Sequence, residues 1–251
     1  MRYLLTWLSF GCLLFASCNG KQQQPTGRDT TASRPILCES TNYTGKVKIA
    51  IVIYDGVEVV DMNGPIDVFT KTNRIADHYY VYTVAAKDTL IYSEKCATAL
   101  LPKYTIYNCP TPDIVVLPGC PPDVVSQLLS DSTFSQTILT WIKKLGTDTT
   151  KEIMSVCTGG ILLGKTGLLD YRQATTHYLA LQEMQQMYPK IKVIGGVRFV
   201  DDKNTISTAG ITSGIDGALH IVEKYEGKTV ADSVAHIMVY NRSCPMRDPS
   251  N

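Results

Sequence analysis

A cysteine at position 157 stands between an apolar run and small residues, in the sequence SVCTGG over residues 155–160. Residues 153–156 are typical of a short buried strand, and residues 158–165 are typical of the start of a helix. We therefore expect Cys157 to lie on a tight strand-to-helix turn, with its sulfur facing the positive end of the helix dipole. Such a nucleophile elbow favours a thiolate that attacks electrophiles at neutral pH.

A carboxyl group and a glycine turn are the next candidates for chemistry. Asp61 follows two valines and precedes a helix start that we predict at Gly64-Pro65. It is either a helix-capping or solvated carboxylate, or a partly desolvated group whose raised pKa suits proton transfer near neutrality. The sequence LPGCPP over residues 117–122 follows another apolar run. There the N–H groups of Gly119 and Cys120 are either oxyanion donors or part of an ordinary Pro-Gly turn.

The elements that must position these residues alternate along the chain. Strands are predicted over five apolar or β-branched runs: residues 47–54, 79–85, 113–117, 153–156 and 191–194. Helices are predicted from Gly64, over 134–145 and over 229–240, and after Ser213, with Asp216 completing a capping box. This alternation predicts a single-domain α/β fold, a doubly wound and mostly parallel sheet flanked by helices. All three candidate segments then follow carboxyl ends of strands, where such sheets bind ligands.

The first residues have a different character from the rest. Arg2 precedes an apolar stretch, residues 4–16, which predicts a signal peptide over residues 1–17. The following Cys18 resembles the lipidated cysteine of bacterial lipoproteins; a plain N-terminal anchor or ordinary signal cleavage is the alternative. Residues 18–45 are polar and predict a disordered tether, so that residues 46–251 form the folded domain. We expect a protein exported to the bacterial cell envelope and held at the membrane by a lipid.

Charge and cysteine usage exclude some classes of protein. The net charge of the 251 residues is +1 and no basic run occurs, so nothing indicates nucleic-acid binding. The cysteine spacing indicates no metal site, and no cofactor is expected. Export permits disulfides, but the sequence leaves the pairing open among Cys38, Cys96, Cys109, Cys120 and Cys244.

Several segments in register resemble the ThiJ/PfpI family, which has the flavodoxin-like, class I glutamine amidotransferase-like fold. The resemblance is closest to its isonitrile hydratase branch and to the sensor domains of AraC-type regulators. It is carried by VDMNGP at 60–65, DIVVLPG at 113–119, SVCTG at 155–159, GLL at 167–169, ATTH at 174–177 and TAGIT at 208–212, through to Asp216.

The resemblance implies a role for each candidate residue. Cys157 would attack the terminal carbon of an isonitrile, and water would then release an N-substituted formamide. Asp61 matches the family carboxyl that handles protons beside the thiol, and Thr158 matches the residue whose hydroxyl and N–H face the site. Gly119 and Cys120 match the second oxyanion element, although the family usually has glycine where Cys120 stands. A homodimer is also implied.

A second departure, after that at Cys120, narrows the chemistry. The protease-like branch has histidine at the position of Thr158, so a Cys-His peptidase dyad is disfavoured. His177 is either a neighbour of the substrate or a structural hydrogen-bond partner. The sequence therefore leaves three readings of function: an isonitrile hydratase-like enzyme, a catalytically silent ligand-binding envelope protein, or an amidase, glyoxalase or deglycase. Too few residues follow the last predicted helix for a helix-turn-helix module, so we expect no DNA-binding part.

Overall fold

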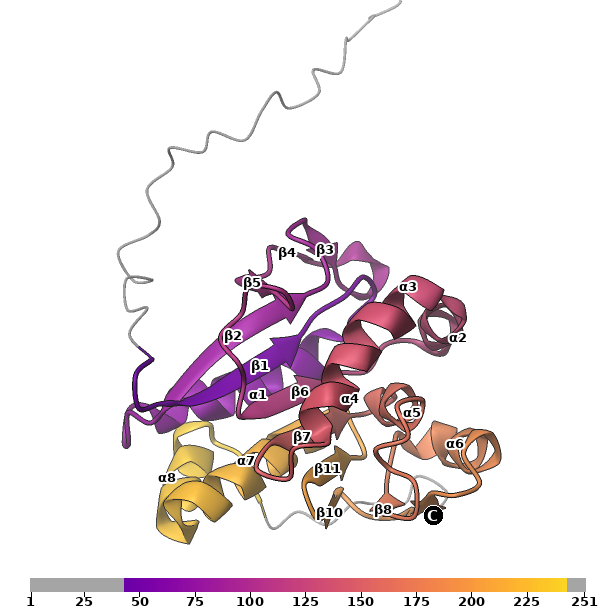
Figure 1. The fold of residues 1–251 in the computed structure, drawn as a ribbon. Helices are drawn as coiled ribbons and strands as arrows, with labels where there is room; N and C mark the ends of the chain where they lie inside the picture. Colours follow the sequence, from indigo (N-terminus) through magenta and orange to yellow (C-terminus); the bar gives the residue numbers. More distant parts are fainter. Residues whose placement is uncertain (1–42, 243–251) are drawn as a thin grey trace, which may run out of the picture. The chain divides into compact units, whose positions relative to one another are not determined.

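A seven-stranded sheet forms the centre of the computed structural model, which describes residues 43–242 (Figure 1). The strand order is β10-β11-β7-β6-β1-β2-β5, and every neighbouring pair is parallel except β10 and β11. The strands are β1 (Val47–Val52), β2 (Tyr79–Ala85), β5 (Tyr104–Thr105), β6 (Ile114–Leu117), β7 (Glu152–Val156), β10 (Phe199–Asp202) and β11 (Thr205–Thr208). Two small sheets pair β3 (Ile91–Tyr92) with β4 (Ala99–Leu100), and β8 (Gln173–Ala174) with β9 (Lys192–Val193).

Helices cover both faces of the sheet. On one face α1 (Val59–Thr72), α7 (Ser213–Glu226) and α8 (Lys228–Ile237) pack on one another. The other face carries α2 (Pro122–Ser130), α3 (Ser132–Phe134), α4 (Thr140–Gly146) and α5 (Gly159–Gly164), with α6 (Leu181–Met187) beside α5. Short helical turns complete the list: η2 (Glu94–Cys96), the π-helical η3 (Ser135–Leu139) and η4 (Tyr178–Ala180). The predicted doubly wound α/β fold with a mostly parallel sheet is confirmed.

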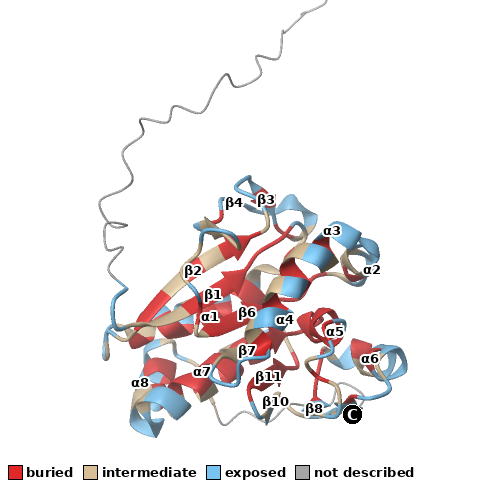
Figure 2. Ribbon diagram, viewed as in Figure 1, coloured by how far each residue is buried: buried red, intermediate tan, exposed pale blue. Residues whose placement is uncertain are grey.

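The core lies on both sides of the central strands, which are red in Figure 2. All four residues of β6 are buried, as are the last four residues of β1 and of β7. Burial on both faces explains why these runs are continuous rather than alternating in the sequence. The three strands end at the same edge of the sheet, and Cys157 and the loops from β1 and β6 follow them there.

Two helix starts differ from the sequence prediction. α1 begins at Val59, not at Gly64, because the Glu58 side chain caps it by accepting a hydrogen bond from the Val60 N–H. Pro65 lies inside this helix, where it lacks only the hydrogen bond to the Asp61 carbonyl. Asp61 is therefore in the first turn of the helix rather than before it.

The capping box predicted at Ser213 is also wrong. Ser213 is already the first residue of α7, and the preceding Thr212 makes no side-chain cap. The Asp216 carboxylate instead pairs with Arg198 and accepts a hydrogen bond of 2.8 Å from the Tyr240 hydroxyl. An ion pair is available to Asp216 because Arg198 approaches from the loop before β10, which the sequence does not place.

The strand predicted over residues 191–194 is β9, and it pairs with β8 outside the central sheet. The signal peptide, Cys18 and most of the tether lie outside the described residues, as do Cys38 and Cys244. Within residues 43–45, the Tyr43 ring packs on that of Tyr80 at 5.1 Å. None of the helices in residues 43–242 has the length and apolar character needed to cross a bilayer.

Candidate active site

Cys157 lies on the predicted elbow between β7 and α5. Its φ angle is 57°, in the left-handed region that non-glycine residues rarely adopt. Two hydrogen bonds fix this backbone: the Cys157 N–H donates to the Thr208 carbonyl (3.0 Å), and the Thr176 hydroxyl donates to the Cys157 carbonyl (2.8 Å). The strained turn is therefore held by β11 and by the segment after β8, and it presents the sulfur at the carboxyl edge of the sheet.

The Asp61 carboxyl is fully buried beside this elbow. Its Oδ2 accepts a hydrogen bond of 3.0 Å from the Gly119 N–H, whereas its buried Oδ1 has no hydrogen-bond partner among the described residues. The pKa of Asp61 is raised to about 7, mainly by burial and in smaller part by the charge of Glu58. The Gly119 N–H and the Cys157 thiol oppose this by lowering the pKa of the carboxyl. The group is thus poised to exchange a proton near neutrality.

The thiol of Cys157 is not ionised in the free protein at neutral pH. Burial raises the pKa of Cys157 well above its usual range, and the negative charge of Asp61 raises it further, although the backbone N–H of Thr158 acts in the opposite direction. The sequence-based prediction that Cys157 is a thiolate at neutral pH is therefore wrong for the unliganded site. α5 has only six residues, so its dipole is too weak to offset burial.

Thr158 and Cys120 are joined through their polar groups. The Thr158 hydroxyl accepts a hydrogen bond from the Cys120 N–H (2.9 Å) and donates one to the Cys120 carbonyl (2.7 Å). Because Gly119 donates to Asp61, both N–H groups predicted as oxyanion donors already have partners within the protein. A side chain at Gly119 has no room, since a Cβ there would lie 2.5 Å from Thr158 Oγ1 and 2.9 Å from Asp61 Oδ2.

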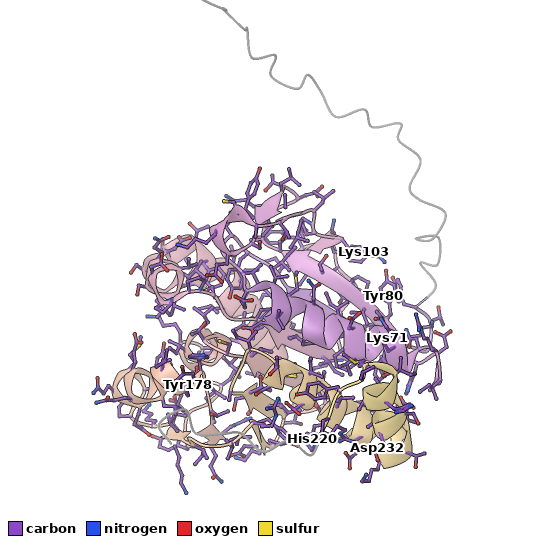
Figure 3. The ribbon with its side chains drawn as sticks, turned by 180° about the vertical axis from the view of Figure 1, so that it is seen from behind. Lys71, Tyr80, Lys103, Tyr178, His220 and Asp232 are labelled. Atoms are coloured by element: carbon purple, nitrogen blue, oxygen red, sulfur yellow. The ribbon has the colours of Figure 1, made fainter. Side chains whose placement is uncertain are left out.

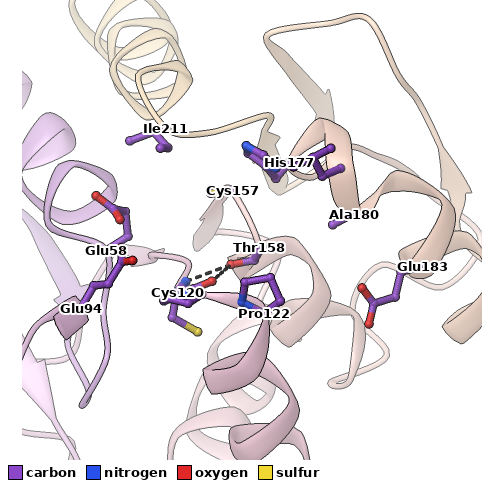
Figure 4. Close-up of a pocket in the computed structure, with 12 residues that line it drawn as sticks. Glu58, Glu94, Cys120, Pro122, Cys157, Thr158, His177, Ala180, Glu183 and Ile211 are labelled. Atoms are coloured by element: carbon purple, nitrogen blue, oxygen red, sulfur yellow. Dashed lines mark hydrogen bonds between the residues drawn. The ribbon is translucent and has the colours of Figure 1, made fainter. Parts of the chain in front are cut away.

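A cavity of about 260 Å³ opens at this edge, and Cys157 and Thr158 are part of its lining. His177, for which the sequence left open a role beside the substrate or a structural role, lines it too; it is half-buried, and burial lowers its pKa. Figure 4 shows Glu58 and Glu94 on one side of Cys157, and His177 and Glu183 on the other. The remaining lining residues are Cys120, Pro121, Pro122, Leu179, Ala180 and Ile211. The structure therefore brings four of the six predicted site residues to the lining of one cavity, and the other two, Gly119 and Asp61, lie buried beside it and hydrogen-bonded to each other.

Several residues of the site were not predicted from the sequence. Gly210, with a φ of 63°, packs so closely on the nucleophile that a Cβ there would lie 2.8 Å from Cys157 Sγ. The Tyr54 hydroxyl donates to the Pro118 carbonyl (2.6 Å) and steadies the loop that carries Gly119. Glu58 and Glu94 were not recognised because they are separated in the sequence and carry no motif. Gly210 belongs to the segment TAGIT, which carries part of the family resemblance. Only the fold shows that this segment lies beside Cys157.

The described cysteines form no disulfide with one another: Cys96, Cys109, Cys120 and Cys157 are free thiols. Burial raises the pKa of Cys120 to about 12, so this second thiol of the cavity is protonated. Cys157 is thus the reactive candidate by its position on the elbow rather than by its ionisation.

Comparison with known proteins agrees with this geometry. Residues 47–224 match the model of the DJ-1/PfpI family. The chain belongs to this family. It is 29% identical over 199 residues to an isonitrile hydratase of Pseudomonas putida, covering 79% of this chain and 81% of the hydratase. A crystal structure of a ThiJ/PfpI family protein from Pseudomonas syringae matches with a TM-score of 0.68 and 26% identity, over 86% of each chain.

Family membership does not by itself specify catalysis. The transcriptional regulator CdhR of Pseudomonas aeruginosa is 32% identical to this chain over 111 residues, which are 44% of the chain and 32% of the regulator. The chain therefore spans about a third of that relative's length. The DJ-1/PfpI fold occurs in both an enzyme and a regulator, and the choice between them depends on the chemistry of the site.

Proposed function

We propose that this protein is a cysteine-dependent hydro-lyase that adds water to an isonitrile and releases an N-substituted formamide. The observation that carries this proposal is the pairing of Cys157, on a strained elbow, with a buried carboxyl of pKa about 7. A protonated thiol needs a base at the moment of attack, and Asp61 is the group placed to serve. The similarity to isonitrile hydratase over most of both chains supports the same activity.

The first half of the reaction forms a thioimidate. The Asp61 carboxylate takes the thiol proton as Cys157 Sγ bonds to the terminal carbon of the isonitrile. The protonated carboxyl then gives this proton to the same carbon, so that the sulfur carries a CH=N–R group. No proton leaves the site in this half, which suits a buried pair that ionises poorly.

The second half consumes water. Water adds to the carbon of the CH=N group, the C–S bond breaks, and the nitrogen takes a proton, which yields the formamide HC(O)–NH–R. The thiol is restored with the remaining proton. Asp61 is again the acid and base, and the Thr158 N–H, which faces the sulfur, is the donor available to the charge that develops there.

The test is turnover of an alkyl isonitrile by the purified full-length protein, followed by formamide release in mass spectrometry. We expect turnover by the natural sequence, and none above background for Cys157→Ala. An absence of formamide in both would contradict the proposal. Amide hydrolysis or aldehyde consumption in the same panel would instead favour an amidase, glyoxalase or deglycase.

The second candidate function is ligand binding without turnover. The raised pKa of Cys157 and the internal partners of the Gly119 and Cys120 N–H groups favour it, as does the similarity to a regulator. A thiol that resists alkylation while the cavity still binds a ligand would support this reading. Export, a lipid on Cys18 and a homodimer remain part of our proposal for either function.

A further inference from the structure

The charged side chains that line the Cys157 cavity are all acidic. Glu58, Glu94 and Glu183 lie on its wall, and no lysine or arginine is among the described lining residues. The one basic side chain there is His177, whose pKa is lowered by burial, so that it is neutral at pH 7. The charge of this cavity is therefore negative, although the net charge of the chain is +1.

Two of the three carboxylates are held against each other. The Glu58 N–H donates to the Gly119 carbonyl (2.9 Å), and the Glu94 N–H donates to the Val57 carbonyl (3.0 Å). Their side chains lie together on one side of the cavity (Figure 4), and hydrogen bonding to Glu58 raises the pKa of Glu94. Asp123 adds to this negative charge and Lys95 opposes it. Two carboxylates in this position are stabilised by a cation between or beside them.

A further unsatisfied acceptor lies buried behind Cys157. Asp61 Oδ1 is buried without a hydrogen-bond partner among the described residues, and the Asp61 side chain interacts with the Cys157 thiol that lines the cavity. The charge of Glu58 acts on both Asp61 and Cys157, and it disfavours ionisation of each. A positive group bound at the wall would remove this effect and favour the thiolate.

We propose that the site selects a substrate whose substituent on the reacting group carries a positive charge, which Glu58 and Glu94 bind. This inference rests on the proposed function for the reacting carbon, whereas the charge preference of the cavity stands independently of it. An anionic substituent is excluded by the same carboxylates. A bound cation also offsets the charge of Glu58, so that the nucleophile becomes easier to ionise when the proper substrate is present.

The experiment uses three ethyl-based methanethiosulfonates: one with a trimethylammonium group, one with a sulfonate group, and a neutral reagent with a hydroxyl group. Each transfers its thiol half to a cysteine thiolate, forming an S–S bond and releasing methanesulfinate. Labelling of Cys157 in the full-length protein is timed by peptide mass spectrometry, since other cysteines are present, and each rate is divided by that of 2-mercaptoethanol. The ratio of cationic to anionic rates cancels any change in the pKa of the thiol.

We expect a ratio of at least about tenfold in the natural sequence, and a decrease of about fivefold or more in Glu58→Gln and in Glu94→Gln. Glu58→Gln keeps the oxygen that caps α1. Asp88→Asn, an exposed position outside the cavity, changes the net charge equally and is expected to leave the ratio unchanged. A normalised ratio near one, or the same decrease in all three variants, would overturn the inference. Isonitrile turnover is not part of this readout, so its failure and the failure of the proposed function are distinguishable.

Discussion

Burial keeps the Cys157 thiol and the Asp61 carboxyl from ionising together. The charge of Asp61 raises the pKa of the thiol, and the thiol lowers the pKa of Asp61 by interacting with its charged form. The pair therefore holds two protons well below pH 7 and one proton above it. In the one-proton state the sulfur attacks an isonitrile only when the carboxylate accepts its proton, whereas alkylation by iodoacetamide needs only the small fraction of thiolate that has lost its proton to water.

The activity profile follows from the pKa of Asp61, which is about 7. Below this pH the carboxyl is protonated and cannot accept the thiol proton, so kcat/KM for an isonitrile is expected to rise through pH 6–8 and then level off. Asp61→Asn is expected to lower kcat/KM by about 10²–10⁴-fold and to abolish this rise. A natural protein with a flat profile, or a variant that keeps the rise, would assign the proton transfer to another group.

The same ionisation affects stability. The pKa of Asp61 is about 7 in the folded protein and 3.8 in an unperturbed carboxyl, so the folded state retains a proton that the unfolded state releases. The stability that this retained proton contributes is complete below about pH 4 and is lost as the pH rises to about 7. Asp61→Asn removes this loss. Urea unfolding should therefore show the variant gaining stability over the natural sequence between pH 4 and pH 7, by up to a few kcal/mol (about 1.4 kcal/mol per pKa unit). Parallel stability curves would contradict the raised pKa.

Atoms of Thr158 and Asp61 lie so close to Gly119 that a side chain there must displace them. Gly119→Ala places a Cβ 2.5 Å from Thr158 Oγ1 and 2.8 Å from the Thr158 nitrogen, which must shift. We expect a loss of about 1–3 kcal/mol in the free energy of unfolding and a larger proportional loss of activity. Gly195→Ala is the matched control, because its Cβ meets only the Leu181 Cδ1 atom, at 3.1 Å. Equal effects of the two substitutions on activity would show that Gly119 has no special role.

At the scale of elements, the apolar buried strands were predictable, whereas β11, which is buried but polar, was not. β1, β2, β6 and β7 are rich in β-branched residues, and each was predicted to within a few residues. β11 has the sequence TIST, and so many hydroxyl residues are typical of a loop. In the structure these residues are buried, β11 pairs with β7, and the Thr208 carbonyl accepts the hydrogen bond from the Cys157 N–H. β11 is buried by residues that are distant in the sequence, so a local sequence pattern cannot predict its burial.

The residues of the site could likewise be predicted only where a local sequence pattern indicates them. Cys157, Asp61 and Gly119 were predicted because each follows an apolar run at a strand end. The acidic wall was missed because Glu58 and Glu94 meet only when the segment before α1 pairs with that after β3. The ionisation of the thiol was predicted in the wrong direction, since burial around a six-residue helix cannot be read from the turn itself.

A polar cluster joins three elements behind the site. Arg198, before β10, pairs with Asp216 of α7, and Tyr240, after α8, donates to the same carboxylate. The Arg198 carbonyl accepts the N–H of Ala209 (2.9 Å), next to the Gly210 that packs on Cys157. These contacts position the segment that closes the back of the elbow. Through Tyr240, they also connect the end of α8 with the segment that packs on Cys157.

Removal of the central carboxylate tests this cluster. Asp216→Ala leaves the partly buried Arg198 without its counter-ion and is expected to cost about 2–4 kcal/mol in the free energy of unfolding. Asp232→Ala removes an exposed carboxylate that pairs with Arg242 and should have a much smaller effect. Chemical denaturation of both variants provides the comparison. Similar small losses would mean that the cluster does not stabilise the segment.

Figure 3 shows the side chains from behind, with the half-buried Lys71 of α1 and the exposed Asp232 of α8 labelled. No helix within residues 43–242 is long and apolar enough to span a bilayer. We propose that a lipid on Cys18, as the sequence predicts, attaches the protein to a membrane. Cys18→Ser is expected to move the protein from the membrane to the soluble fraction of a bacterial host and to abolish incorporation of labelled palmitate. Unchanged fractionation and labelling would contradict a lipid anchor.

In the whole molecule, the fold joins Cys157 and Asp61 into one proton-sharing site. The decisive measurement is the pH dependence of Cys157 alkylation by iodoacetamide, read by peptide mass spectrometry, in the natural protein and in Asp61→Asn. Because the charge of Asp61 opposes ionisation of the thiol, the variant should alkylate faster than the natural protein above pH 7, with a lower apparent pKa, while its isonitrile turnover falls. Superimposable alkylation profiles for the two proteins would contradict the claim.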